Sequence, residues 1–160
     1  MLDPVLEQKM DEIAERIFGT QKDPEQIPIT KESGEKLEAL TPHWIKYKLD
    51  GQNNPIAWVM ILPTSLELMT EFLEGRINER ELLDLTKPQD TYEALYLCAA
   101  ITVPEYRRRG YAVELLIEGI NSIPHDRNVK LFAWPHSSEG EGLIEKIEKL
   151  LNTKVLIRNK

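Results

Sequence analysis

The stretch of residues 93–102 constrains the fold more than any other part of this chain, because apolar residues fill both faces of the strand that it predicts. Such a strand must be covered on each side, as in the middle of the sheet of an α/β protein. The apolar run 56–62 precedes it, and the turn residues 51–54 join that run to the alternating segment 43–49. The sequence therefore predicts a buried central strand next to an antiparallel hairpin.

Helical patterns surround these strands. Thr64 with Glu67, and Asn78 with Glu81, have the spacing of a capping box, in which a polar residue and a later glutamate close the start of a helix. They predict two short helices between the hairpin and the central strand. Two more helices are expected in residues 1–42, where apolar residues recur at helical spacing.

The remainder of the chain alternates between strand and helix patterns. A helical stripe covers residues 112–120, and the predicted strands 129–134 and 154–158 enclose a second helix over 143–151. With 160 residues, 41% of them hydrophobic, the chain can bury one ordinary core. We therefore expect a single α/β domain over 1–160, with a mixed, mostly antiparallel central sheet flanked by helices.

Charge and composition exclude several classes of function. A formal net charge of −7 disfavours nucleic acid as a partner, since nucleic-acid binders normally present a basic face. One cysteine, Cys98, allows no internal disulfide and favours a reducing compartment, so we expect a cytoplasmic protein. The apolar runs are too short to cross a membrane, and the three histidines stand without a second ligand at metal spacing. We therefore expect no membrane contact and no metal.

The segment between the central strand and the next helix carries the clearest chemical signal. Arg107, Arg108 and Arg109 precede Gly110, and the helix begins at Tyr111. The first turn of a helix has amides without intrahelical partners and a partial positive charge, so it accepts phosphate groups. Gly110 has no side chain to keep a phosphate from the backbone, and the small Ala112 also permits close approach. The segment therefore predicts a phosphate-binding turn.

This turn resembles a signature of the GNAT superfamily of N-acetyltransferases, which places Gln/Arg-x-x-Gly-x-Gly/Ala after a central strand. Here the signature stands as Arg107-x-x-Gly110-x-Ala112. The resemblance implies an acyl-CoA N-acyltransferase-like fold in which the turn binds the pyrophosphate of acetyl-CoA and residues 103–160 form the CoA-binding half. It also implies that edge groups of the preceding strand, around Ala100, Ile101 and Val103, hold the pantetheine arm. The implied reaction is direct attack of a small-molecule or peptide amine on the thioester.

The chain departs from the family where the catalytic acid usually lies. Many members have a tyrosine on the last helix, whereas this chain has Ile147-Glu148-Lys149 in the corresponding stretch. The sequence also ends about ten residues later, so the resemblance implies a truncated C-terminal hairpin, and a second subunit in a homodimer could complete the substrate side. Glu93, at the start of the central strand, resembles the position of a general base in some members.

Several alternatives stay open at this stage. Glu93 could equally be a solvated carboxylate at a strand end, and Cys98 could be a packed thiol rather than a nucleophile. His136 and Ser137 follow a predicted strand and could face the thioester or simply form a polar turn. A non-catalytic CoA-binding regulatory module is the main alternative function, and a purely structural domain is a third.

Overall fold

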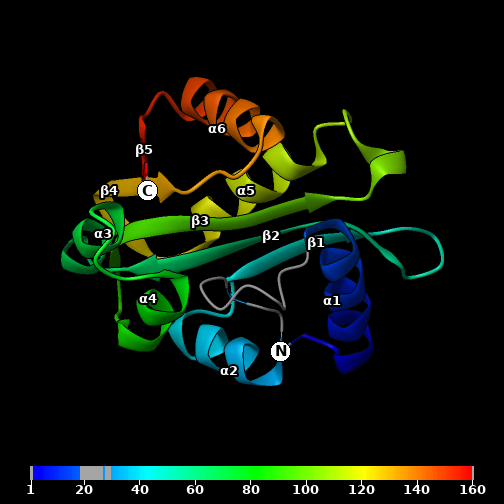
Figure 1. Ribbon diagram of the computed structural model, residues 1–160, viewed down its shortest axis with the longest axis horizontal. Helices are drawn as coiled ribbons and strands as arrows, with labels where there is room; N and C mark the ends of the chain where they lie inside the picture. The colour runs from blue at the N-terminus through cyan, green and yellow to red at the C-terminus, as the bar shows by residue number, and fades with distance from the viewer. Residues whose placement is uncertain (1, 19–26, 28–29, 160) are drawn as a thin grey trace.

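A long mixed sheet organises the chain (Figure 1). The computed structural model describes residues 2–18, 27 and 30–159. The strands lie in sequence order in the sheet, β1 to β5. The elements in chain order are α1 (Pro4–Phe18), α2 (Lys31–Leu40), β1 (Ile45–Leu49), β2 (Pro55–Thr64), α3 (Leu66–Leu73), α4 (Glu79–Leu85), β3 (Tyr92–Thr102), α5 (Tyr111–Ser122), β4 (His125–Ala133), α6 (Ser138–Leu151) and β5 (Val155–Ile157).

The sheet is mixed, and its two kinds of pairing divide along the chain. The β1/β2 and β2/β3 pairs are antiparallel, whereas the β3/β4 and β4/β5 pairs are parallel. The predicted α/β class with a mixed sheet is therefore confirmed. The antiparallel majority is not found, because α5 and α6 each return the chain to start the next strand in the same direction. In the described part of the carboxyl-terminal region, the single strand β5 stands where a shortened hairpin was expected.

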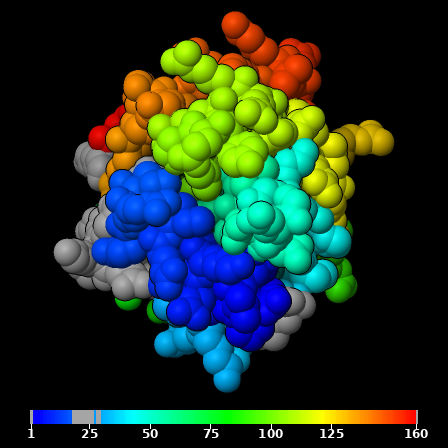
Figure 2. Space-filling view, turned by 90° about the vertical axis from the view of Figure 1, so that its right-hand side faces the viewer, coloured from blue at the N-terminus to red at the C-terminus, as the bar shows by residue number. Residues whose placement is uncertain are grey.

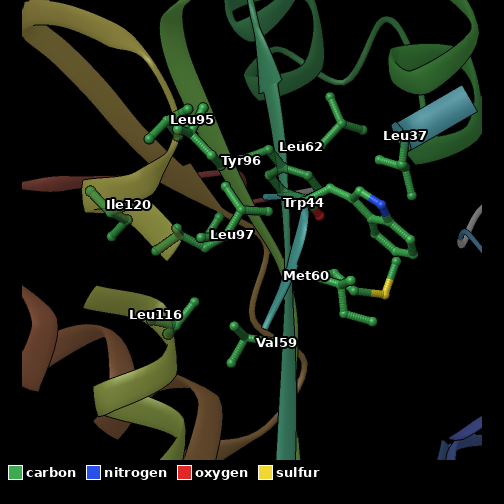
Figure 3. Packing of buried hydrophobic residues seen from close by; sticks show 14 of the residues in the cluster. Leu37, Trp44, Val59, Met60, Leu62, Leu95, Tyr96, Leu97, Leu116 and Ile120 are labelled. Atoms are coloured by element: carbon green, nitrogen blue, oxygen red, sulfur yellow. The ribbon is translucent and has the colours of Figure 1, made fainter. Parts of the chain in front are cut away.

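The core fills both faces of the central strands. Every residue of β2 is buried, as the apolar run predicts. Leu116 and Ile120 of α5 pack on one side of the strands, whereas Leu37 of α2 and Trp44 lie on the other (Figure 3). The helices divide accordingly, with α5 and α6 on one side of the sheet and α1, α2 and α4 on the other (Figure 1). This arrangement places β3 in the interior and the start of α5 beyond the end of β3.

One glycine lets α5 lie close to β2. A Cβ added at Gly119 would come 2.7 Å from Cδ1 of Ile61, nearer than real Cβ contacts. The absence of a side chain at Gly119 thus lets α5 pack closely on the side chain of Ile61 in β2.

The caps of the helices test the predicted starts. Asn78 and Glu81 form the predicted reciprocal capping box at α4. The prediction at α3 was one residue early, because Ser65 is the cap and its hydroxyl accepts from the amide of Leu68. Thr64 instead ends β2, and its hydroxyl shares a hydrogen bond with that of Thr86. The extended strand continues through Thr64 and leaves the capping position to the next hydroxyl.

No helix in the described residues is long and apolar enough to span a bilayer.

Candidate functional site

The parallel strands β3 and β4 stop pairing midway along β3, where β4 ends. Their pairing ends where Leu97 lies opposite Ala133, the last residue of β4. β3 continues to Thr102 and stays paired with β2 along its other edge. Figure 1 shows β3 extending past the end of β4. The five residues of β3 from Cys98 to Thr102, about 16 Å long at 3.3 Å per residue, therefore have one edge without a neighbouring strand.

The ladder with β2 shows which backbone groups of β3 face this open edge. We refer to the region beside the open edge, beyond the end of β4, as the gap. Val103 donates its amide to the carbonyl of Ile56, so its N–H points toward β2. Because alternate residues of a strand point the same way, Ile101 also faces β2. The sequence prediction named Ala100, Ile101 and Val103 as edge groups. In the observed register Ala100, together with Thr102, faces the open edge, whereas Ile101 and Val103 face β2. No described residue is hydrogen-bonded to the amides of Ala100 and Thr102.

A bulge lies where the two strands separate. Ile61 pairs with Leu97 and Met60 with Ala99, which leaves Cys98 as an extra residue in β3. A bulge bends and twists its strand, so it helps to turn β3 away from β4. Burial of the Cys98 thiol, followed by the charge on Glu79, raises its pKa well above the usual value. The thiol therefore stays protonated near neutral pH, which disfavours the nucleophile interpretation of this residue.

The chain leaves β3 through a turn with unusual backbone angles. Arg108 has a φ of 67° and Gly110 a φ of 78°, both in the left-handed region. A residue other than glycine costs about 1 kcal/mol or more in this region, so Arg108 holds a strained conformation. Left-handed residues in turns are a feature of the backbone concavities that bind anions. A Cβ added at Gly110 would meet no atom within 4 Å, so the space above the turn is open.

The first turn of α5 lacks the usual closure by a side chain. Gly110 occupies the capping position and offers no acceptor, and the first intrahelical bond runs from Glu114 to its carbonyl. The amides of Tyr111, Ala112 and Val113 therefore have no acceptor among the described residues. Such amides and the positive end of the helix dipole are the groups that bind phosphate at helix starts.

Three cationic side chains directly precede these amides in the chain. Arg107, Arg108 and Arg109 are exposed, and none of them forms an ion pair with a described residue. The Arg107 Nε donates to the carbonyl of Thr102 at 3.2 Å, and the Arg109 guanidinium lies 5.0 Å from the ring centroid of Tyr106. Both interactions leave donors of these side chains available to an anion.

A fourth cation comes from the hairpin. The Nζ of Lys48 in β1 lies 4.4 Å from the ring centroid of Tyr111 and 3.8 Å from a carboxylate oxygen of Glu114. Sequence patterns give no sign of this contact, because Lys48 is 63 positions away from Tyr111 along the chain. Figure 2 shows the turn after β3, in yellow-green, beside the β1–β2 turn, in blue-green, and near α1. The predicted residues from Arg107 to Ala112 thus gather on one face together with Lys48.

Glu93 does not belong to this group. It lies at the start of β3, at the opposite end of the strand from Thr102. Its carboxylate accepts a hydrogen bond of 3.3 Å from the amide of Leu66, in the first turn of α3. The structure thus gives Glu93 a contact with the start of a helix, remote from the arginine turn.

The two polar residues after β4 make different contacts, one with the start of α6 and one with Trp134. Ser137 caps α6, and its hydroxyl accepts from the amide of Gly140 at 3.1 Å. The ring of His136 stacks 4.6 Å from that of Trp134, the first residue after β4. Residues 134–137 thus connect the end of β4 to the start of α6.

A buried ionisable cluster lies behind the point where the strands separate, and sequence patterns did not single it out. The hydroxyl of Tyr96 donates to the carboxylate of Glu79, which is only 5% exposed. Arg158, near the carboxyl terminus, is 7% exposed. Burial and then the charge on Glu79 raise the pKa of Tyr96 well above its usual value, while Arg158 acts in the opposite direction. Glu79, Tyr96 and Arg158 are far apart in the sequence, and no local spacing links them. The sequence therefore carries no signal that they form a cluster.

Other kinds of site find little support. No group of three or more histidine, cysteine, aspartate or glutamate side chains in the described residues is placed to hold a metal ion. Two shallow hollows lie away from the arginine turn, one between α2 and α4 and one over the start of β4 and β5. Comparison with models of known protein families and with curated proteins gives no match to this chain.

Proposed function

We propose that the chain binds an acyl-coenzyme A at the arginine turn and transfers the acyl group to an amine. The observation that carries this proposal is a row of amides without a described acceptor, at Ala100 and Thr102 on the edge of β3 and then at Tyr111, Ala112 and Val113 in the first turn of α5. Phosphates suit the positive end of this row, and an extended arm with amides suits the strand edge. The GNAT resemblance of Arg107, Gly110 and Ala112 supports the same assignment.

The chain's own residues would bind and orient the cofactor. Amides of Tyr111 and Ala112 would receive diphosphate oxygens, while the nearby arginines and Lys48 add attraction. The amide of Ala100 would hold the pantetheine arm. Bound acetyl-CoA would supply an acyl group activated as a thioester. The gap directs that end toward the place where Leu97 and Ala133 stop pairing, and positioning of an amine there would provide much of the rate.

The second candidate function is a CoA-binding module without turnover, and α6 supplies the observation in its favour. Ile147 is fully buried, and the carboxylate of Glu148 accepts from the amide of Val155 at 2.9 Å. The stretch where the family has its tyrosine is thus occupied by groups that hold α6 to the core and to β5. Neither residue offers a proton to a departing thiolate.

Two measurements separate these functions. Calorimetric titration with CoA and the shift in melting temperature test binding, because a ligand that binds only the folded state raises its stability. We expect a shift that grows with CoA concentration, and its absence at millimolar CoA would contradict the proposal. Thiol release from acetyl-CoA in the presence of a panel of amines then tests turnover. Binding without thiol release would identify the regulatory module.

A further inference from the structure

Arg158 connects three parts of the chain: the end of β4, α3, and the connection between α3 and α4. Its backbone amide donates to the carbonyl of Ala133, the last residue of β4, at 3.0 Å. Its guanidinium carbon lies 4.1 Å from the ring centroid of Trp134 and 4.6 Å from that of Phe72 in α3. Its Nη1 donates to the carbonyl of Ile77, between α3 and α4, at 2.8 Å. One residue thus ties the exit of β4 to both helices.

A charge in this place needs compensation. Removing a guanidinium from water costs several kcal/mol even after relaxation, and the Nε of Arg158 has no hydrogen-bond partner among the described residues. The two aromatic faces and the Ile77 carbonyl supply part of the compensation. The carboxylate of Glu79 acts on the same neighbour, Tyr96, with the opposite sign, so a negative charge lies within electrostatic range. The site is therefore built around a cation rather than around an apolar side chain.

The position of Trp134 is what this cation controls. β5 has only three residues, and it pairs with β4 no further than Ala133. Trp134 therefore leaves the sheet without a strand on either side. Apart from Arg158, its ring contacts Phe72, at 5.9 Å between centroids, and His136. Trp134 is the first residue beyond the point where β3 and β4 stop pairing, so the position of its ring bears on how the chain after β4 lies relative to the open edge of β3.

We propose that Arg158 is a positioning residue, which holds the exit of β4 against α3 and α4 and keeps the edge of β3 from Cys98 to Thr102 open for the pantetheine arm. The inference rests on the proposed function, since it assigns a role in binding the same cofactor. The proposal predicts different effects on two parts of one ligand, because the arginine turn that binds the phosphates lies at the far end of the gap from Arg158. Loss of Arg158 should therefore weaken binding of the arm and leave binding of the nucleotide part intact.

The test compares Arg158→Met with the unaltered protein by titration calorimetry. Methionine is unbranched and packs well against aromatic rings, so it fills the space between Trp134 and Phe72 without the charge. The ligands are CoA and adenosine 3′-phosphate 5′-diphosphate, which lacks the pantetheine arm. We expect CoA to bind about tenfold more weakly, as for the loss of about 1.4 kcal/mol, while the nucleotide binds within about twofold. Arg127→Met, at an exposed arginine of β4, is the matched control and should change neither affinity.

The outcomes are distinct. Equal weakening of both ligands, or an unchanged affinity for CoA, would overturn the role of Arg158. Failure of the unaltered protein to bind either ligand would overturn the proposed function together with this inference. If Arg158→Met does not fold, Trp134→Leu takes its place. This variant removes the Trp134 ring that the Arg158 guanidinium contacts, and it keeps the hydrogen bond from Arg158 to the carbonyl of Ile77. The same selective loss of CoA binding is expected, and an unselective loss or none would contradict the proposal.

Discussion

The molecule contains two consecutive units of strand, turn and helix, and the starts of their helices differ. In the β4–α6 unit, Ser137 caps the helix, and two acidic residues, Glu139 and Glu141, lie in its first turn. In the β3–α5 unit, Gly110 offers no side-chain cap, and three arginines precede the helix. The protein itself supplies a side-chain acceptor at the start of α6, whereas the start of α5 has none and is preceded by positive charge.

The two strands differ in the same sense. The parallel-paired end of β4 is Leu131, Phe132 and Ala133, none of which is ionisable. β3 buries Tyr96 and carries Cys98 at its bulge, and then continues beyond its parallel partner. A unit that serves only the fold closes its polar groups locally. In the proposed function, an external ligand would supply the partners that are missing along this unit, from strand edge to helix start.

The largest expected effect comes from closing the open helix start. Gly110→Glu places bulk and negative charge in the open space above the turn, and also strains a residue at φ 78°. We expect CoA affinity to fall about a hundredfold or more, since repulsion replaces a charge-assisted contact. Calorimetry with CoA measures the loss. Gly142→Glu, also directed into open space but on α6, is the control and should leave CoA affinity unchanged. Equal effects of the two variants would remove the distinction between the units.

Removal of the cations should have the next largest effect. Combined replacement of Arg107, Arg108 and Arg109 by glutamine should weaken CoA binding about tenfold to a hundredfold and flatten its dependence on salt, because exposed charges are screened. The control replaces three cations that line the hollow over β4 and β5, namely Arg127, Lys130 and Lys154, by glutamine. An equal loss in this control would mean that overall charge, rather than the turn, attracts the ligand.

The closed helix start allows the reverse test. Ser137→Ala removes the hydroxyl that accepts from Gly140, so urea denaturation should show a loss of about 1 kcal/mol in the free energy of unfolding. CoA affinity should stay the same, because this cap faces no ligand in the proposed arrangement. A stability loss accompanied by weaker CoA binding would indicate that α6 also takes part in the site.

The smallest effect concerns the strand of the first unit and appears with pH. Burial raises the pKa of the Cys98 thiol, so the folded chain keeps its proton to a higher pH than the unfolded chain. Below the ordinary thiol range both states are protonated, and as the pH rises through that range only the unfolded state loses its proton. The free energy of unfolding should therefore fall between about pH 8 and about pH 10, and fall less in Cys98→Ala. Parallel curves for the two proteins would contradict the raised pKa of the half-buried Cys98 thiol.

Local patterns predicted the elements well, because each depends on neighbouring residues. The two-faced apolar runs gave β2 and β3, and the spacing of Asn78 and Glu81 gave the start of α4. The predicted cap Thr64 was wrong by one residue, since the length of the strand before α3 depends on its pairing with β3. Half-parallel pairing of the sheet likewise arises from packing of whole helices rather than from any local signal.

The candidate site was predictable only where it is continuous in sequence. The segment from Arg107 to Ala112 was found because its donors and cations are neighbours along the chain. The choice between Ala100 and Ile101 for the open edge requires the register with β2, which no single strand reveals. Lys48 and Arg158 are 110 positions apart in the sequence, and they reach the site from β1 and from just after β5. Such contacts depend on tertiary structure, so spacing rules cannot supply them.

The most direct test of the account follows the backbone amides themselves. In a ¹H–¹⁵N correlation spectrum titrated with CoA, the amides of Tyr111 and Ala112 should shift strongly as phosphate oxygens become their hydrogen-bond partners. The amide of Gly140, already bonded to Ser137, should hardly move. Shifts confined to other surfaces, with Tyr111 and Ala112 unchanged at saturating CoA, would contradict the claim that the uncapped start of α5 is a phosphate site.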